Sequence, residues 1–266
     1  MNYLKPIPGQ VPYLYVHDPP QGVPRSNIET EEHEVVVQDV RGKEDTVGLD
    51  KTGFQFVKHV SAEKDFDDEE RIQKVYYKEI EELLKKATGA KRIFIFDHTI
   101  RRNYDNASLE GAPASFRGPV KRVHIDQTFA ASVARVHHHL GAEADRLLKS
   151  RVRIINVWRP IQNPVAHDPL GVADYYSIDV DNDLVSSRHI YPDREGATFA
   201  VKYSPKHRWY HLANQRPDEV TLIKCFDSET DRARLTPHSA FADTTSPESA
   251  PRRQSIEVRA LVFDAE

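Results

Sequence analysis

The chain has 266 residues, and 37 lysine and arginine residues nearly balance 41 aspartate and glutamate residues, giving a net charge of -4 at pH 7. No basic stripe interleaved with aromatic residues is present, so a nucleic acid is not an expected partner. Cys225 is the only cysteine, which excludes an internal disulfide. The N-terminus lacks the apolar core of a signal peptide, and no apolar run approaches the ~20 residues of a membrane helix. We therefore expect a soluble, cytoplasmic protein with no membrane partner.

The length and the 39% of hydrophobic residues allow one large core, so we expect a single domain over residues 1–266. The first thirty residues differ from the rest in their many prolines, which remove backbone donors and hold the chain extended. We expect residues 1–30 to form an arm that wraps the body.

The predicted elements begin with strands at 34–40 and 54–60. A helix follows at 67–86, with acidic residues at its start, apolar residues every three or four positions and Gly89 beyond its end. Residues 91–98 are typical of a buried strand, and residues 103–117 of a loop that forms a lid. A strand at 120–128 precedes a second helix, capped by Thr128, that runs from Phe129 to about His139 and resumes through Leu148.

The second half of the chain is predicted to be almost entirely β-structure, with strands at 152–160, 175–180, 198–203, 208–212, 220–226 and 255–263. Many short strands with two early helices predict a mainly β fold, a β-sandwich or jelly roll covered by helices on one side.

The predicted strand at 120–128 carries His124 and Asp126 on one face, because residues two apart on a strand point to the same side. An imidazole and a carboxylate suit Fe(II), which is often held by two histidines and one carboxylate. About two His-x-Asp or His-x-Glu pairs are expected by chance from this composition. The alternative is therefore a surface strand whose histidine forms a salt bridge.

A third ligand has to come from a later strand, and the candidates are His189, His207, His211 and His238. His207 and His211 would share a face only on a helix, and their surroundings are typical of a strand. His238 enters a strand after a turn. The later Arg253-x-Ser255 can hold a carboxylate through paired guanidinium N–H groups and one hydroxyl.

The order His124-x-Asp126, His238, Arg253-x-Ser255 resembles the Fe(II)- and 2-oxoglutarate-dependent dioxygenases. More narrowly, the chain resembles the fungal hydroxylase/desaturase family. The segments that carry this narrower resemblance are 155–160, 169–170, 207–210, 218–220, 226–228, 237–241 and 253–259. The resemblance implies a double-stranded β-helix, with iron held by His124, Asp126 and His238. It also implies that Arg253 and Ser255 bind the cosubstrate 2-oxoglutarate. Because two arginines are adjacent, Arg252 and not Arg253 could be the one that holds the carboxylate.

Four further residues are candidates for contact with the substrate or cosubstrate: Asn156, Trp158, Arg159 and Tyr210. Trp158 is more often a core residue than a stacking surface. Asn156 and Arg159 are three apart, so they face opposite sides of a regular strand unless the chain bends before Pro160. We expect Arg259 to form a structural ion pair with Glu257 or Asp227.

The function implied by the resemblance is oxidation of an unactivated C–H bond in a small molecule with Fe(II), 2-oxoglutarate and O2. We expect a small polar metabolite of secondary metabolism as substrate. Hydroxylation, desaturation and oxidative cyclisation stay open, as does the oligomeric state. The alternative is a non-catalytic jelly-roll binding protein in which the same His and Asp are structural.

Overall fold

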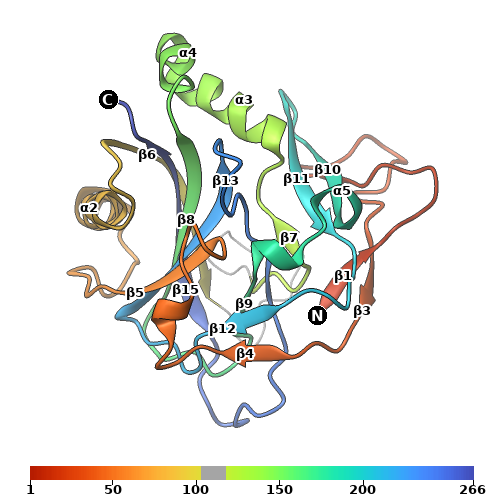
Figure 1. Cartoon of the computed structure of the whole chain (residues 1–266). Coiled ribbons are helices and arrows are strands. Elements are labelled where there is room, and N and C mark those ends of the chain that lie inside the picture. Colours follow the sequence, from red (N-terminus) through yellow and green to blue (C-terminus); the bar gives the residue numbers. More distant parts are fainter. Residues whose placement is uncertain (103–117) are drawn as a thin grey trace.

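Two β-sheets face each other in the computed structural model of the chain, which describes residues 1–102 and 118–266 (Figure 1). Within these residues the larger sheet has the strand order β2 (Tyr13–Tyr15), β10 (Leu184–Ile190), β11 (Glu195–Val201), β7 (His124–Ile125), β14 (His238–Ala240), β9 (Leu170–Ala173), β12 (Trp209–His211) and β4 (Val37–Asp39). The smaller sheet has the order β5 (Phe54–Lys58), β13 (Glu219–Asp227), β8 (Val152–Pro160), β15 (Gln254–Phe263) and β6 (Arg92–Arg102). The predicted mainly β fold class is confirmed.

The central strand β8 is buried along its whole length. Ile154 and Trp158 point to the core between the two sheets, whereas Ile155 and Val157 point to a second core on the outer face. A strand that is buried on both faces needs apolar residues at successive positions, which explains the adjacent apolar pairs Ile154-Ile155 and Val157-Trp158. The smaller sheet therefore separates two hydrophobic cores.

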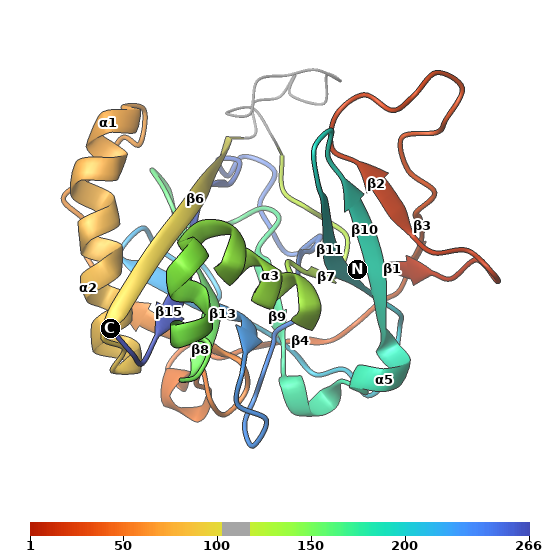
Figure 2. The same ribbon diagram turned by 90° about the horizontal axis from the view of Figure 1, so that it is seen from above.

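The outer face of the smaller sheet is covered by one helical segment, seen beside β6 in Figure 2. It consists of α1 (Glu69–Arg71), the π-helical turn η2 (Ile72–Tyr76) and α2 (Tyr77–Thr88). The Asp68 carboxylate caps its start by accepting from the backbone N–H of Glu70 and Arg71, and Gly89 ends it with a φ of 70°. Ile80 and Leu84 pack against the sheet. The predicted helix at 67–86 is confirmed, apart from its π-helical turn.

The second predicted helix is divided into α3 (Phe129–Leu140), the 3-10 turn η4 (Gly141–Glu143) and α4 (Ala144–Leu147). Thr128 caps it as predicted, because its Oγ1 accepts from the N–H of Ala131 at 3.1 Å. Val136 and Leu147 belong to the core between the sheets, so α3 and α4 close one end of the sandwich (Figure 1). Among the described residues, no helix is both long and apolar enough to cross a membrane.

Several element predictions are corrected. Residues 175–180 are not a strand: they form the 3-10 turn η5 (Tyr175–Ser177) and lead into α5 (Val180–Asp183), since Asp174 and Asp179 cap these turns. The strand at 120–128 is reduced to β7, and β6 is half-buried rather than buried because it is the edge strand. Strands β9 and β10 were not predicted. The 3-10 turn η1 (Glu44–Thr46) lies between β4 and β5. The predicted lid at 103–117 lies outside the described residues.

The N-terminal segment contributes β1 (Asn2–Lys5) and β3 (Glu29–Glu32), which pair with each other, and β2, which runs parallel to β10. Tyr3 on β1 is fully buried, and its hydroxyl accepts a hydrogen bond from Trp209 Nε1 at 2.7 Å. This bond ties the start of the chain to β12.

Replacing Tyr3 by Phe is expected to lower the free energy of unfolding by about 1–3 kcal/mol, because the buried indole N–H of Trp209 loses its acceptor. Urea denaturation measures this change. Tyr13→Phe is the matched control, since the Tyr13 hydroxyl makes only an exposed bond of 3.4 Å to Pro24 O. Equal stabilities of the two variants would contradict the expected role of the Tyr3 hydroxyl.

Candidate metal centre

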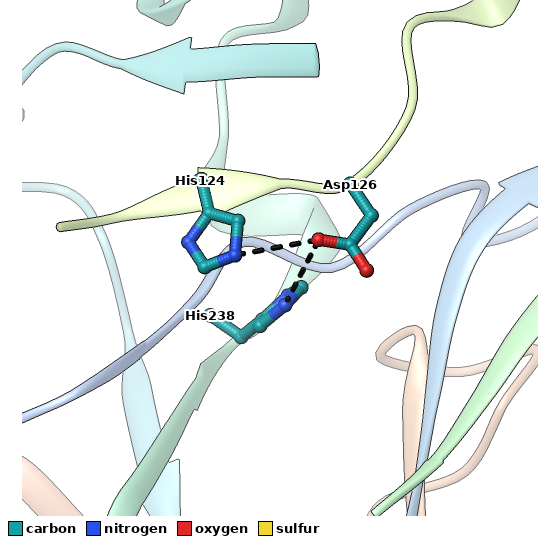
Figure 3. Close-up of side chains that lie close together, drawn as sticks. All are labelled: His124, Asp126 and His238. Atoms are coloured by element: carbon teal, nitrogen blue, oxygen red, sulfur yellow. Dashed lines mark ion pairs between the residues drawn. The ribbon is translucent and has the colours of Figure 1, made fainter. Parts of the chain in front are cut away.

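The pairing of β7 with β14 brings together residues that are far apart in the sequence. His238 on β14 lies directly opposite His124 on β7 in the antiparallel register. Asp126 follows β7 two residues after His124. The three side chains point toward one another (Figure 3).

The ligand atoms of these three residues lie close enough to share one cation. His124 Nε2 is 3.3 Å from Asp126 Oδ1, and His238 Nε2 is 3.9 Å from the same oxygen. One ligand atom from each residue can be chosen so that all lie within 4.8 Å of one another. No other group of three or more His, Cys, Asp or Glu residues in the described ranges has this geometry.

The backbone fixes the tautomer of both histidines. His124 Nδ1 lies 2.8 Å from the carbonyl oxygen of Arg122, and His238 Nδ1 lies 3.0 Å from that of Thr236. A carbonyl oxygen can only accept, so each Nδ1 carries the proton and donates it. In the neutral ring Nε2 then keeps its lone pair, which is the form that binds a metal.

Burial lowers the pKa of His238 to about 4, and the neighbouring His124 acts in the same direction, while Asp126 opposes them. His238 is therefore neutral at pH 7 and available as a ligand.

The Asp126 carboxylate is surrounded by groups that stabilise its charge. Burial alone would raise the pKa of Asp126, but its polar and cationic neighbours, Arg259 among them, hold that pKa well below its usual range. Asn156 on β8 donates from Nδ2 to Asp126 Oδ2 at 2.6 Å, and Arg259 Nη1 lies 3.8 Å from Oδ2. The carboxylate is thus ionised, with Oδ1 directed toward the imidazoles and Oδ2 held by Asn156.

The three candidate ligands border a cavity of about 60 Å³. Its other lining residues are Arg101, Val120, Trp158, Leu170, Ser239, Ala240, Arg253, Glu257 and Arg259. Two neutral imidazole nitrogens and one carboxylate on one side of an open cavity match the donor set that binds non-haem Fe(II) and leaves positions free. The residues present therefore fit iron.

Arg253 and Arg252 differ sharply in environment. Arg253 is 5% exposed and lines the cavity, whereas Arg252 is exposed. Burial and the nearby Arg101 lower the pKa of Arg253 to about 10, so it stays protonated at neutral pH. Its Nη1 donates to Asp168 O at 2.5 Å, and its buried Nε has no partner among the described residues. An anion such as a carboxylate fits beside this guanidinium. Ser255 is buried two residues further on.

Of the residues expected to contact the substrate or cosubstrate, Trp158 and Asn156 lie at the candidate metal centre, and Arg159 does not. Trp158 lines the cavity, with the Arg253 Cζ 5.4 Å from its ring centroid, and Asn156 contacts Asp126. Arg159 points to the opposite face of β8, where its Nε donates to the Tyr76 hydroxyl at 3.0 Å and Nη1 to Pro217 O at 2.6 Å. Side chains along β8 thus alternate regularly between its two faces, with no bend before Pro160. Because Arg159 faces the turn η2, it is not brought to the candidate metal centre.

Tyr210 is half-buried on β12, and its ring centroid lies 5.7 Å from that of Phe54. It is not one of the described residues that line the 60 Å³ cavity. The other candidate histidines also have different neighbours: His207 contacts Asp183, His211 packs on Phe241, and His189 lies 3.3 Å from Thr198 Oγ1.

Sequence reasoning did not identify Arg259 as part of the site. Its Nε donates to Asp97 Oδ1 on β6 at 2.7 Å, so the expected ion pair with Glu257 or Asp227 is corrected. Glu257 and Arg259 line the cavity together with Arg253. These three residues are separated by even numbers of positions, so an extended chain presents them on one face. The sequence alone could therefore have placed Arg259 on the same side as Arg253.

Comparisons with known proteins agree with this geometry. A family model described as "Oxidoreductase/YMDC permease-like domain" matches residues 1–263. The chain is 37% identical over 252 residues to the hydroxylase/desaturase efuI of Hormonema carpetanum, covering 86% of this chain and 83% of that relative. It is 32% identical to the Fe(II)/2-oxoglutarate-dependent dioxygenase nvfI of Aspergillus novofumigatus, covering 99% of this chain and 95% of that protein.

Solved structures give the same result. The iron and alpha-ketoglutarate-dependent endoperoxidase NvfI superimposes with a TM-score of 0.89 at 32% identity, covering 100% of this chain and 97% of that structure. The jelly-roll fold class and the predicted enzyme class are thereby confirmed, and the alternative of a non-catalytic binding protein is set aside. The chain belongs to the family of Fe(II)- and 2-oxoglutarate-dependent hydroxylases, desaturases and related dioxygenases.

Proposed function

We propose that His124, Asp126 and His238 hold Fe(II) in this dioxygenase, and that Arg253 and Ser255 bind the distal carboxylate of 2-oxoglutarate. The observation that carries the proposal is that one cavity joins the three candidate ligands to a buried arginine with an unpartnered Nε. When bound, Fe(II) with 2-oxoglutarate and O2 supplies the oxidising chemistry for an unactivated C–H bond.

The chain's own residues prepare this site. The backbone carbonyls of Arg122 and Thr236 keep the protons of His124 and His238 on Nδ1, which directs both Nε2 lone pairs to one point. Asn156 holds Asp126 through Oδ2 and leaves Oδ1 to bind the metal. These supports act before any ligand arrives, so the site is organised in advance.

Arg253 is suited to the cosubstrate because it is buried and charged. The Trp158 ring lies beside its guanidinium, with Arg253 Cζ 5.4 Å from the ring centroid. A carboxylate that enters replaces water with a charge-assisted pair, which is stronger than a neutral hydrogen bond. We assign Arg253 rather than Arg252 to this role because Arg252 is exposed.

We further propose that residues 1–266 work as one dioxygenase domain in the cytoplasm, on a small polar metabolite. The single domain is supported by core residues contributed from β1 to β15, and the metabolite by the proximity of charged residues to the site. The choice between hydroxylation, desaturation and cyclisation depends on the position of the substrate.

Replacing His124, Asp126 or His238 by Ala is expected to abolish Fe(II) binding and activity, because the remaining two ligands lose both geometry and charge balance. Metal analysis after equilibrium dialysis and release of succinate from 2-oxoglutarate measure the two effects. His211→Ala is the control and should keep both. Retained iron binding in His238→Ala, with loss in His211→Ala, would show that the third ligand is His211 and not His238.

Arg253→Ala is expected to raise the 2-oxoglutarate concentration needed for half-maximal succinate release, by an amount equivalent to about 2–5 kcal/mol, since a buried carboxylate loses its charged partner. Ser255→Ala should cost about 1 kcal/mol. Arg252→Ala is the matched control. A larger effect in Arg252→Ala than in Arg253→Ala would show that Arg252, and not Arg253, binds the carboxylate.

Asn156→Ala is expected to weaken Fe(II) binding about 10- to 100-fold, because Asp126 loses the donor that orients it. The same dialysis experiment measures the change. Asn163→Ala, in the loop after β8, is the control and should bind iron normally. An unchanged affinity in Asn156→Ala would show that the other neighbours of Asp126 suffice to orient it.

A further inference from the structure

A second cavity, of about 590 Å³, meets the cavity that contains Arg253. The residues that line both are Arg101, Val120, His124, Asp126 and Arg259. A molecule in the second cavity can therefore contact His124 and Asp126 without entering the space beside Arg253. This position is suitable for a substrate.

Arginine dominates the charge of the second cavity. Its charged lining residues other than histidine are Arg25, Arg101, Arg122, Arg135, Arg194 and Arg259, against Asp97 and Asp126. Both aspartates are already engaged: Asp97 accepts from Arg259 Nε at 2.7 Å, and Asp126 belongs to the candidate metal centre. The chain as a whole carries a net charge of -4, so this cavity is a positive region in an acidic protein.

Arg122 and Arg135 contribute charge that no described carboxylate neutralises through an ion pair. The Nε atom of each is buried and has no hydrogen-bond partner in the part of the chain that the structure describes. Arg135 instead lies over the Phe96 ring, with its Cζ 4.6 Å from the centroid, and its Nη1 is 3.4 Å from His139 Nε2. Within residues 1–102 and 118–266, neither arginine thus helps to hold the fold together through a salt bridge.

The two arginines come from different elements that meet at this cavity. Arg122 lies two positions before the first residue of β7, and Arg135 lies in the middle of α3. Burying a guanidinium without an acidic partner is unfavourable, and an anionic ligand removes this penalty when it binds. Guanidinium groups match a carboxylate in geometry as well as in charge.

The remaining lining is partly apolar and includes Leu14, Val16, Val120, Tyr191 and Ala197. Tyr191 is covered by Arg194, whose Cζ is 3.9 Å from the ring centroid at the exposed turn between β10 and β11. An apolar wall with cationic groups at fixed points favours a molecule with a hydrocarbon skeleton and one anionic group.

We propose that this small polar metabolite is a carboxylate with a hydrocarbon skeleton, and that Arg122 and Arg135 bind its carboxylate group in the second cavity while its skeleton extends toward His124 and Asp126. The oxidation of this molecule rests on the proposed function, but its binding does not. Arg122 and Arg135 act as specificity-determining residues, because an uncharged analogue leaves both guanidinium groups without a partner.

The test compares 2-naphthylacetate with its methyl ester, two probes that differ in charge but share the same apolar ring system. Binding of each to the full chain is measured by equilibrium dialysis under anaerobic conditions, with Fe(II) and saturating 2-oxoglutarate present to fill the first cavity. The acid is expected to bind at least about tenfold more tightly than the ester. An ester that binds as tightly as the acid, or an acid that does not bind, overturns the proposal.

Variants then locate the carboxylate. Arg122→Gln and Arg135→Gln should each weaken binding of the acid about tenfold and leave binding of the ester unchanged. Arg122→Lys and Arg135→Lys keep the charge and should recover part of the affinity for the acid. Arg188→Gln on β10 is the control, since Arg188 is exposed and pairs with Glu195. Equal loss in the control and in the two test variants would contradict the assignment.

Two outcomes separate this inference from the proposed function. If Arg253→Gln, rather than Arg122→Gln or Arg135→Gln, removes the preference for the acid, the probe occupies the cosubstrate cavity and the inference fails. If the preference depends on Arg122 and Arg135 but the protein forms no succinate from 2-oxoglutarate, the inference stands and the proposed function fails.

Discussion

The buried carboxylate of Asp126 is the group on which the arrangement of the site depends. A carboxylate at this depth is unfavourable unless donors and cations surround it, and here Asn156 from β8 donates to it and Arg259 from β15 lies beside it. His124 from β7 and His238 from β14 lie close enough to share a cation with it. β7 and β14 belong to one sheet, and β8 and β15 to the other. The charge of Asp126 therefore links the two sheets across the core.

This link explains why the smaller sheet has to be buried on both faces. Its inner face provides Asn156, Trp158 and Arg253 to the candidate metal centre, and only rigid strands hold such groups within the tolerance that metal binding requires. Its outer face is covered by α1, η2 and α2, and there Arg159 donates a hydrogen bond to the hydroxyl of Tyr76 in η2. Arg159 thus fixes the helix that supports the strand, and its effect on the site is indirect.

Local rules predicted much of this arrangement from the sequence. The period of two identified His124 and Asp126 as neighbours, and acidic residues and the Thr128 cap marked the two helix starts. The same period separates Asn156 from Arg159. What the sequence did not reveal is pairing between distant strands: that His238 lies opposite His124, or that Arg259 reaches Asp97. Such contacts depend on strand order and register, which local patterns do not encode.

In our proposal the two cavities divide the recognition of the two organic molecules, 2-oxoglutarate and the substrate. Both cavities would bind a carboxylate through arginine, yet they differ in the state of that arginine: Arg253 is almost completely buried, whereas Arg122 and Arg135 line a larger space. The smaller space selects a compact acid by size, and the larger one accepts a larger acid by charge. Because His124 and Asp126 border both cavities, a metal between them would lie within reach of both molecules while the arginines keep their carboxylates apart.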